Sequence, residues 1–134
     1  METSAVRVPR VIARLEPNEI FVFGSNTAGR HGAGAARQAH IEFGAEMGVG
    51  EGLTGQCYAF PTLDAVLRQL PRAELAAARD NFFRTCSEHP EKCFLLTKVG
   101  CGLAGYPEAF MQSFFSDPPA NLILPEDWEA PSCR

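Results

Sequence analysis

The stretch that decides the fold is Phe21-Val22-Phe23-Gly24-Ser25-Asn26-Thr27-Ala28-Gly29-Arg30-His31-Gly32-Ala33-Gly34-Ala35-Ala36. An apolar run typical of a β-strand passes directly into a glycine-rich turn and then into alanine-rich, helix-forming sequence. Glycines let backbone N–H groups approach an anion closely, and the N-terminus of the following helix adds a partial positive charge. The stretch therefore predicts a phosphate-binding loop between a strand and a helix.

A second element of the same kind follows later in the chain. The apolar run Leu95-Leu96-Thr97-Lys98-Val99 leads into Gly100-Cys101-Gly102-Leu103-Ala104-Gly105-Tyr106-Pro107, in which Pro107 suits the first turn of another helix. Its three glycines can expose backbone donors, and the ring of Tyr106 can stack on or cover part of a ligand. Two such loops in one small chain predict a ligand with two phosphates.

The remaining pattern alternates between strand and helix. Strands are expected at 19–24, 57–60, 93–99 and 121–124, and helices at 34–43, 71–88 and 107–115. The glycine-dense stretch 48–55 is expected to be a loop, and Pro61 to end the second strand. This order predicts a layered α/β fold with a largely parallel sheet. The 134 residues suit a single domain, 1–134, with a core at about 19–128 and trailing ends.

Composition narrows the possible partners. The net charge is −4 and the 12 Lys and Arg residues form no run, which argues against broad nucleic-acid binding. No apolar stretch approaches the roughly 20 residues of a membrane helix, and the first residues lack the apolar centre of a signal peptide. No membrane association and a cytoplasmic location are therefore expected.

The cysteines and histidines predict no metal site. Five cysteines occur without CxxC spacing, and the three histidines supply no regular ligand spacing beside them. Buried, reduced thiols are the simplest interpretation. Neither a disulfide framework, nor a metal site, nor a cofactor is expected. The cysteines are Cys57, Cys86, Cys93, Cys101 and Cys133.

Three motifs in this order resemble the macro domain family. They are the first loop with Asn26, then GLTGQCYAFPT at 52–62, then GCGLAGYP at 100–107. The forms FGSN-x-AGRHGAGAA and GCGLAGY look most like a compact bacterial or phage-type branch of that family. The resemblance covers about residues 20–128.

The resemblance implies a three-layer α/β/α fold with a mixed, largely parallel sheet. It implies that ADP-ribose, or an ADP-ribosyl-containing nucleotide, binds in a cleft at the carboxyl ends of the strands, where open α/β sheets usually hold ligands. An ADP-ribosylated protein is one candidate partner. Loop 26–34 would lie near the distal ribose, loop 100–106 would wrap the diphosphate, and 54–62 would form part of the cleft floor. The expected ligand-binding residues are Gly24, Ser25, Asn26, Arg30, Gly32, Gly34, Thr62, Gly100, Cys101, Gly102, Leu103, Ala104, Gly105 and Tyr106.

The chain departs from the family at two points. Members that cleave ADP-ribosyl esters often carry an acid just after the glycines of the first loop, but here no Asp or Glu occurs between Asn26 and Glu42. Members also commonly place an Asp upstream, where it reads the adenine amino group, whereas this chain has no Asp before Ile20 and offers Glu16 and Glu19 near it.

Two functions of different classes follow. One is a module that binds ADP-ribose without turning it over, which the missing acid favours slightly. The other is an ADP-ribosyl hydrolase or phosphatase with Asn26 and His31 as catalytic candidates, in which the loops position a water. A weaker third reading is a nucleotide-binding protein for another diphosphate.

For several of these residues a purely structural role is an alternative interpretation. Asn26 could bond its own turn, and His31 could be an exposed loop histidine that shapes the turn or contacts phosphate. Cys101 could be a nucleophile, though a small space-filling residue is favoured. Arg30 is either a phosphate fork or solvent-exposed, and Lys98 could simply face solvent.

Overall fold

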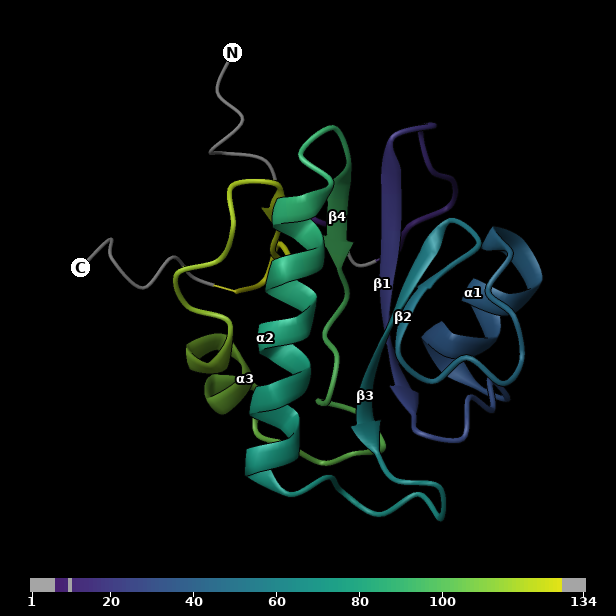
Figure 1. Cartoon of the computed structure of the whole chain (residues 1–134), viewed down its shortest axis with the longest axis vertical. Helices are drawn as coiled ribbons and strands as arrows, with labels where there is room; N and C mark the ends of the chain where they lie inside the picture. Colours follow the sequence, from purple (N-terminus) through teal and green to yellow (C-terminus); the bar gives the residue numbers. More distant parts are fainter. Residues whose placement is uncertain (1–6, 10, 129–134) are drawn as a thin grey trace.

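A five-stranded sheet forms the centre of the molecule (Figure 1). The computed structural model describes residues 7–9 and 11–128. The strands lie in the order β2-β3-β1-β4-β5 across the sheet. Their bounds are β1 Glu19–Asn26, β2 Gly52–Thr54, β3 Cys57–Leu63, β4 Cys93–Leu96 and β5 Leu122–Ile123.

The sheet is mixed and largely parallel, as predicted. Strand β1 pairs in parallel with β3 on one side and with β4 on the other, and β5 continues the parallel order beside β4. Only β2 is antiparallel, to β3. All strands except β2 therefore direct their carboxyl ends toward the same edge of the sheet.

Helices cover both faces of the sheet and complete an α/β/α arrangement. Helix α1 (Gly34–Phe43) packs on one face, while α2 (Arg72–Glu88) and α3 (Glu108–Phe114) lie on the other (Figure 1). Side chains of a strand alternate between the two faces. In β1, Phe21 and Phe23 accordingly join the apolar cluster that contains Ala39 of α1, and Ile20 and Val22 join the larger cluster beneath α2 and α3.

Helix α2 confirms the predicted core stripe. Its buried residues are Leu75, Ala78, Phe82 and Cys86, which recur at helical spacing. Phe82 is fully buried, and its ring centroid lies 4.6 Å from that of Tyr58 and 6.0 Å from that of Phe94. One helical side chain thus contacts two different strands.

The structure corrects the predicted strand bounds. Strand β1 continues to Asn26 and β5 spans only Leu122–Ile123, and three further differences are larger. The stretch 48–55 contains the short strand β2, and β3 continues through Pro61 to Leu63. Proline is tolerated there because β2 pairs with β3 only as far as Ala59, so Pro61 has a strand neighbour on one side alone. Strand β4 ends at Leu96, since the chain turns away where the N–H of Val99 donates to the carbonyl of Thr97 at 2.7 Å.

The sequence also predicts trailing segments at both chain termini, but the described residues near the two termini pair with each other beside the sheet. Val8 forms a parallel bridge with Pro125. The N–H of Val8 donates to Leu124 O at 2.8 Å, and the N–H of Glu126 donates to Val8 O at 2.7 Å. Residues 1–6, 10 and 129–134, with Cys133 among them, lie outside the described part.

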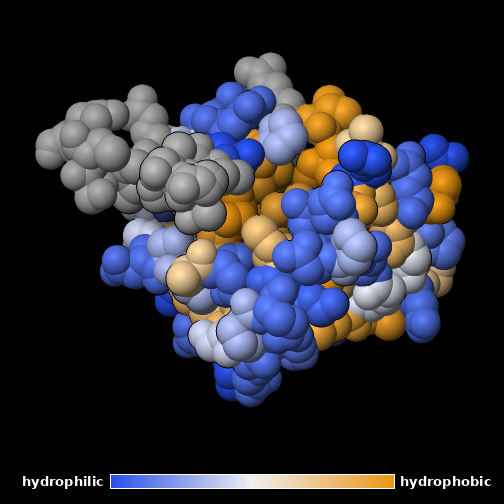
Figure 2. All heavy atoms as spheres, turned by 90° about the horizontal axis from the view of Figure 1, so that it is seen from above, coloured by the Kyte–Doolittle hydropathy of each residue, from blue (hydrophilic) through white to orange (hydrophobic). Residues whose placement is uncertain are grey.

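The two ends of the sheet differ in what they present. Figure 2 views the end that carries the amino ends of the parallel strands, where hydrophilic side chains cover much of the surface and hydrophobic ones are exposed between them. The glycine-rich loops follow the carboxyl ends of β1 and β4, at the other end.

None of the helices described is long and apolar enough to cross a bilayer.

Phe82→Ala should lower the free energy of unfolding by about 3–5 kcal/mol, because it removes a fully buried ring from the contacts of α2 with the sheet. The matched control is Phe83→Ala, since Phe83 is the next residue of α2 and only half-buried. Urea unfolding of both variants measures the difference. Equal losses would contradict the placement of Phe82 at the centre of the core.

Candidate functional site

The two glycine-rich loops line one cleft, here called the main cleft, with a volume of about 520 Å³. The loop after β1, the end of β3 with the turn that follows it, and the loop after β4 each contribute to its wall. Its lining residues are Gly24, Ser25, Asn26, Arg30, Gly32, Ala33, Gly34, Ala35, Ala36, Thr62, Leu63, Leu67, Thr97, Lys98, Val99, Gly100, Gly102, Leu103 and Ala104.

Asn26 closes the first loop with its side chain. Its Nδ2 donates to the carbonyl of Arg30 at 2.9 Å, and its Oδ1 accepts from the N–H of Arg30 at 3.0 Å. The carbonyl of Asn26 also accepts from the N–H of Gly29 at 2.9 Å. Both ends of the amide are thus engaged in the turn, as the structural reading of Asn26 expects.

The first loop packs directly on the segment before β2. A Cβ on Gly29, whose φ is +73°, would lie 2.3 Å from the carbonyl carbon of Gly48, and one on Gly50 would lie 2.5 Å from Asn26 O. The Ser25 hydroxyl donates to the carbonyl of Gly50. Glycine is therefore required at 29 and 50 because two backbones touch there.

Helix α1 begins at the main cleft. Its N-cap, Ala33, provides no side-chain hydrogen bond, and its first turn contains no acidic residue. The first-turn residues Gly34, Ala35 and Ala36 line the cleft. Backbone N–H groups at a helix start have no intrahelical acceptor and favour an anion. The start of α1 therefore offers donors to a negatively charged ligand.

The loop after β4 is a compact turn. The N–H of Gly105 donates to Gly102 O at 3.0 Å, and the N–H of Tyr106 donates to Gly100 O at 2.8 Å. Gly100 and Gly105 have φ values of +80° and +77°, which favour glycine. A Cβ on Gly102 would meet no atom within 4 Å. Gly102 thus leaves open space at the cleft.

The charged residues that line the main cleft are Arg30 and Lys98, and no carboxylate is among the lining residues. The Arg30 guanidinium donates to the carbonyl of Ala65, in the turn after β3. Lys98 Nζ lies 2.9 Å from an Asp127 oxygen and 3.0 Å from a Glu108 oxygen, and these contacts raise the pKa of Lys98. Lys98 therefore has structural ion-pair partners instead of simply facing solvent, and it remains charged.

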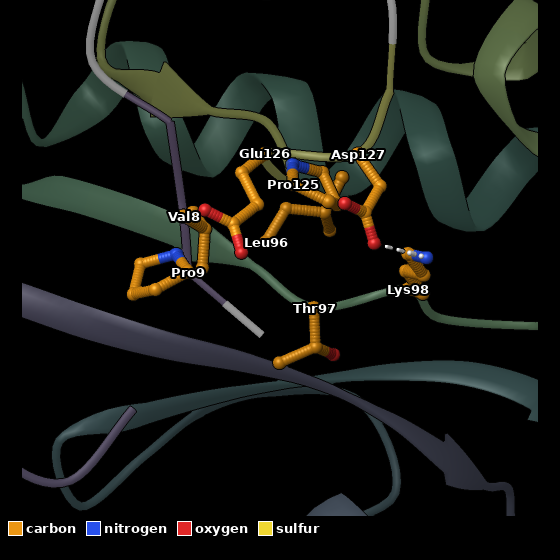
Figure 3. A pocket seen from close by; sticks show the side chains of 8 residues that line it. All are labelled: Val8, Pro9, Leu96, Thr97, Lys98, Pro125, Glu126 and Asp127. Atoms are coloured by element: carbon orange, nitrogen blue, oxygen red, sulfur yellow. Dashed lines mark hydrogen bonds and ion pairs between the residues drawn. The ribbon is translucent and has the colours of Figure 1, made fainter. Parts of the chain in front are cut away.

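A second hollow, here called the side pocket, adjoins the main cleft and has a volume of about 370 Å³ (Figure 3). The two share Thr97 and Lys98 as lining residues. Figure 3 shows the Lys98–Asp127 pair at one end of the pocket. The other lining residues are Val8, Pro9, Leu96, Pro125, Glu126 and Asp127. Residues near opposite ends of the chain build this pocket, so no local motif indicates it.

His31 is buried, contrary to the expectation of an exposed loop histidine. It is 1% exposed and does not line the main cleft. Its Nε2 lies 2.8 Å from the carbonyl of Glu46, which can only accept, so Nε2 carries the proton. The ring centroid of Phe23 lies 5.1 Å from that of His31, and the two rings are nearly perpendicular. The loop turns His31 inward because it packs on the segment that follows α1.

Tyr106, Cys101 and Gly105 are likewise not among the lining residues of the main cleft. Tyr106 is 2% exposed, its hydroxyl donates to the carbonyl of Leu70, and its ring stacks on Phe110. Tyr106 therefore packs beneath the loop as part of the core, and its ring is too buried to contact a ribose. Cys101 is half-buried, and burial raises the pKa of its thiol, which disfavours a nucleophilic thiolate.

The other described cysteines are also free thiols. Burial raises the pKa of Cys57 and of Cys86 to about 12, and it raises the pKa of Cys93 as well. Within residues 7–9 and 11–128, no group of three or more His, Cys, Asp or Glu side chains is placed to hold a metal ion.

Replacing Asn26 by Ala should lower the free energy of unfolding by about 1–3 kcal/mol, because both part-buried hydrogen bonds between its amide and the backbone of Arg30 are lost. Asn26→Asp keeps an acceptor for the Arg30 N–H but loses the donor to Arg30 O, so its loss should differ from that of Asn26→Ala. Chemical denaturation of the two variants beside wild type measures this. Unchanged stability in Asn26→Ala would show that the amide does not hold the loop.

The chain was compared with protein-family models, with curated proteins and with solved structures, and none of the three comparisons finds a match. The function is therefore inferred from the residues of the main cleft and the side pocket.

Proposed function

We propose that this chain binds ADP-ribose, or a nucleotide that contains an ADP-ribosyl group, as a macro-domain-like binding module. One observation carries the proposal. Two glycine-rich loops far apart in the sequence line a single cleft, into which the uncapped start of α1 also leads. With Arg30 and Lys98 in its wall and no carboxylate among its lining residues, this cleft suits an anion in a protein whose net charge is −4.

The dimensions and chemistry of the two hollows suggest how the ligand lies. The diphosphate occupies the main cleft between the start of α1 and the loop 100–105, where backbone N–H groups and the Arg30 guanidinium favour it, while the ammonium of Lys98 is shared with Asp127 and Glu108. Lys98 lines both hollows, so a nucleotide that extends from one into the other passes beside its ammonium group. The distal ribose then lies toward the loop after β1.

The side pocket is the proposed place of the base. Pro9 gives it exposed apolar surface for a flat ring, while the other apolar lining residues, Val8, Leu96 and Pro125, are buried. Carboxylate oxygens of Glu126 or Asp127 can accept a hydrogen bond from an exocyclic amino group. Glu19, one of the acids considered for this contact, lies at the start of β1 and accepts from the N–H of Glu16 at 2.9 Å. It is therefore at the opposite end of the strand from the main cleft.

Binding is preferred over hydrolysis because the cleft lacks an evident acid or base. No Asp or Glu lines it, His31 is buried away from it, and the amide of Asn26 is engaged with the backbone of Arg30. General acid–base catalysis needs a group within hydrogen-bond reach of the reacting atoms. The same cleft could receive ADP-ribose attached to a protein, so an ADP-ribosylated protein remains the proposed partner.

Calorimetric titration should give a dissociation constant for ADP-ribose in the micromolar range, or about −8 kcal/mol. AMP should bind more weakly, because it lacks the second phosphate and the distal ribose. Equal affinity for AMP and ADP-ribose would contradict the proposal.

Gly102→Val should abolish this binding and leave the fold intact. A side chain at 102 enters the open space of the cleft, while its Cβ meets no atom of the protein within 4 Å. Ala109→Val, at an exposed position of α3, is the control for an added branched side chain. A folded Gly102→Val variant with full affinity would show that the loop 100–105 does not hold the anion.

Wild type should release no ADP-ribose from an ADP-ribosylated protein over several hours, because no carboxylate and no histidine lines the cleft. The assay measures free ADP-ribose for wild type, Asn26→Ala and His31→Ala side by side. Fast release by wild type that falls about 100-fold in Asn26→Ala, as when a transition-state contact is lost, would favour the hydrolase instead. A fall in His31→Ala as well would make His31 the candidate acid or base.

A further inference from the structure

Leu67 has an unfavourable backbone conformation at the main cleft. Its φ is +64°, in the left-handed region that side chains other than glycine avoid. It lies in the turn between β3 and α2, and it is among the residues that line the cleft. Such an outlier persists only where the surrounding structure imposes it, and outliers of this kind cluster at ligand sites.

The turn that carries Leu67 is held at several points. The N–H of Asp64 donates to Arg68 O at 2.8 Å, and the N–H of Leu67 donates to Asp64 O at 3.0 Å. The Asp64 carboxylate accepts from the N–H groups of Val66 and Arg68, both at 2.9 Å. These contacts fix the backbone at 67 whatever side chain it carries. Glycine would adopt the same backbone conformation without strain, yet the residue at 67 is leucine.

Leu67 has an apolar counterpart on the loop after β4. Leu103 also lines the main cleft and is 80% exposed, and Leu67 is 49% exposed. The two segments are joined, because Gln69 Nε2 donates to the carbonyl of Ala104 at 2.8 Å. Two large apolar side chains are thus held at one cleft with much of their surface in water. A ligand that covers them gains the free energy of burying that surface.

We infer that Leu67 and Leu103 are specificity-determining residues that pack on the distal ribose of the bound ligand. The inference rests on the proposed function. Phosphates are served by backbone N–H groups and cations, and contact with leucine would only remove water from them. The carbon face of a ribose, in contrast, gains from such contact. The pair therefore favours ADP-ribose over ADP, which ends at the second phosphate, and the strain at Leu67 is the cost of placing its side chain there.

The test compares Leu67→Gly with Leu67→Ala. Both remove the apolar side chain, so each should weaken ADP-ribose binding about tenfold and change ADP binding less than about twofold. Only Leu67→Gly relieves the backbone, so only that variant should also raise the melting temperature and lower the unfolding equilibrium constant about fivefold. A gain in stability with a loss of affinity is not what a merely structural role would give.

The matched control is Asp117→Gly. Asp117 is the other described non-glycine residue with a positive φ, +53°, and it lines neither hollow. Because Asp tolerates the left-handed region better than Leu does, this variant should gain less stability, and it should keep wild-type affinity for both ligands. Leu103→Ala, at an exposed position, should lose ADP-ribose affinity with no change in melting temperature.

Three outcomes would overturn the inference. Wild-type affinity for ADP-ribose in a more stable Leu67→Gly variant would overturn it and leave the proposed function standing. Equal losses of ADP and ADP-ribose affinity would show that the leucines do not read the distal ribose. No ADP-ribose binding by wild type itself would remove the proposed function and the inference together.

Discussion

The parallel pairing of β1 with β3 on one side and β4 on the other is the constraint on which the cleft depends. Phe21 lies opposite Cys57 and Leu95, and Val22 lies opposite Tyr58 and Leu96. Because these strands run in one direction, the segments that follow all three emerge at the same edge. The two glycine-rich loops and the turn with Leu67 meet there for that reason alone. An irregular register between Ser25 and Asn26 shifts the β3 partner from Pro61 to Leu63 at the last residue of β1.

Burial of both faces holds this arrangement in place. The parallel strands have apolar side chains on both faces, so a layer of helices is needed on each. Phe82 and Phe115 fill one side, and Ala39 with Phe43 covers the other. Small residues in α1 let it approach the sheet closely, and its N-terminus then stands at the cleft without a side-chain cap. Close packing of α1 and the proposed anion binding thus both favour small residues after Gly32.

Local patterns predicted the parts of the fold that local interactions decide. Helix α1 has the predicted bounds because Gly44, at φ +85°, ends it as a left-handed C-cap. Strand β2 was missed because its three residues lie in a glycine-dense stretch and form a strand only against β3. The pairing of Val8 with Pro125, and with it the side pocket, joins distant parts of the chain that no periodicity relates.

Side-chain roles were harder to predict than elements, because burial depends on what packs against a loop. The neighbours of His31 are charged or glycine, which suggests exposure, yet the segment 44–50 covers it. Tyr106 has the chemistry to cover a ribose, but its hydroxyl reaches the carbonyl of Leu70 and its ring is buried. The resemblance to macro domains implied ligand-binding roles for Gly24, Arg30 and Thr62, and these residues line the main cleft because they lie near the carboxyl ends of β1 and β3.

The glycines divide into those the fold requires and those it does not. Gly29 and Gly50 touch other backbones, and Gly100 has a positive φ, so packing and geometry account for them. Gly32 and Gly102 have neither reason, since a Cβ on each would meet no protein atom within 4 Å and neither φ is positive.

Leu67 is the converse case, a side chain where the backbone conformation favours glycine. Gly32, Gly102 and Leu67 all line the main cleft. Residues that the local backbone conformation and packing do not favour are expected at functional sites. Space left open at 32 and 102, and a side chain held under strain at 67, are both accounted for by a molecule that occupies the cleft.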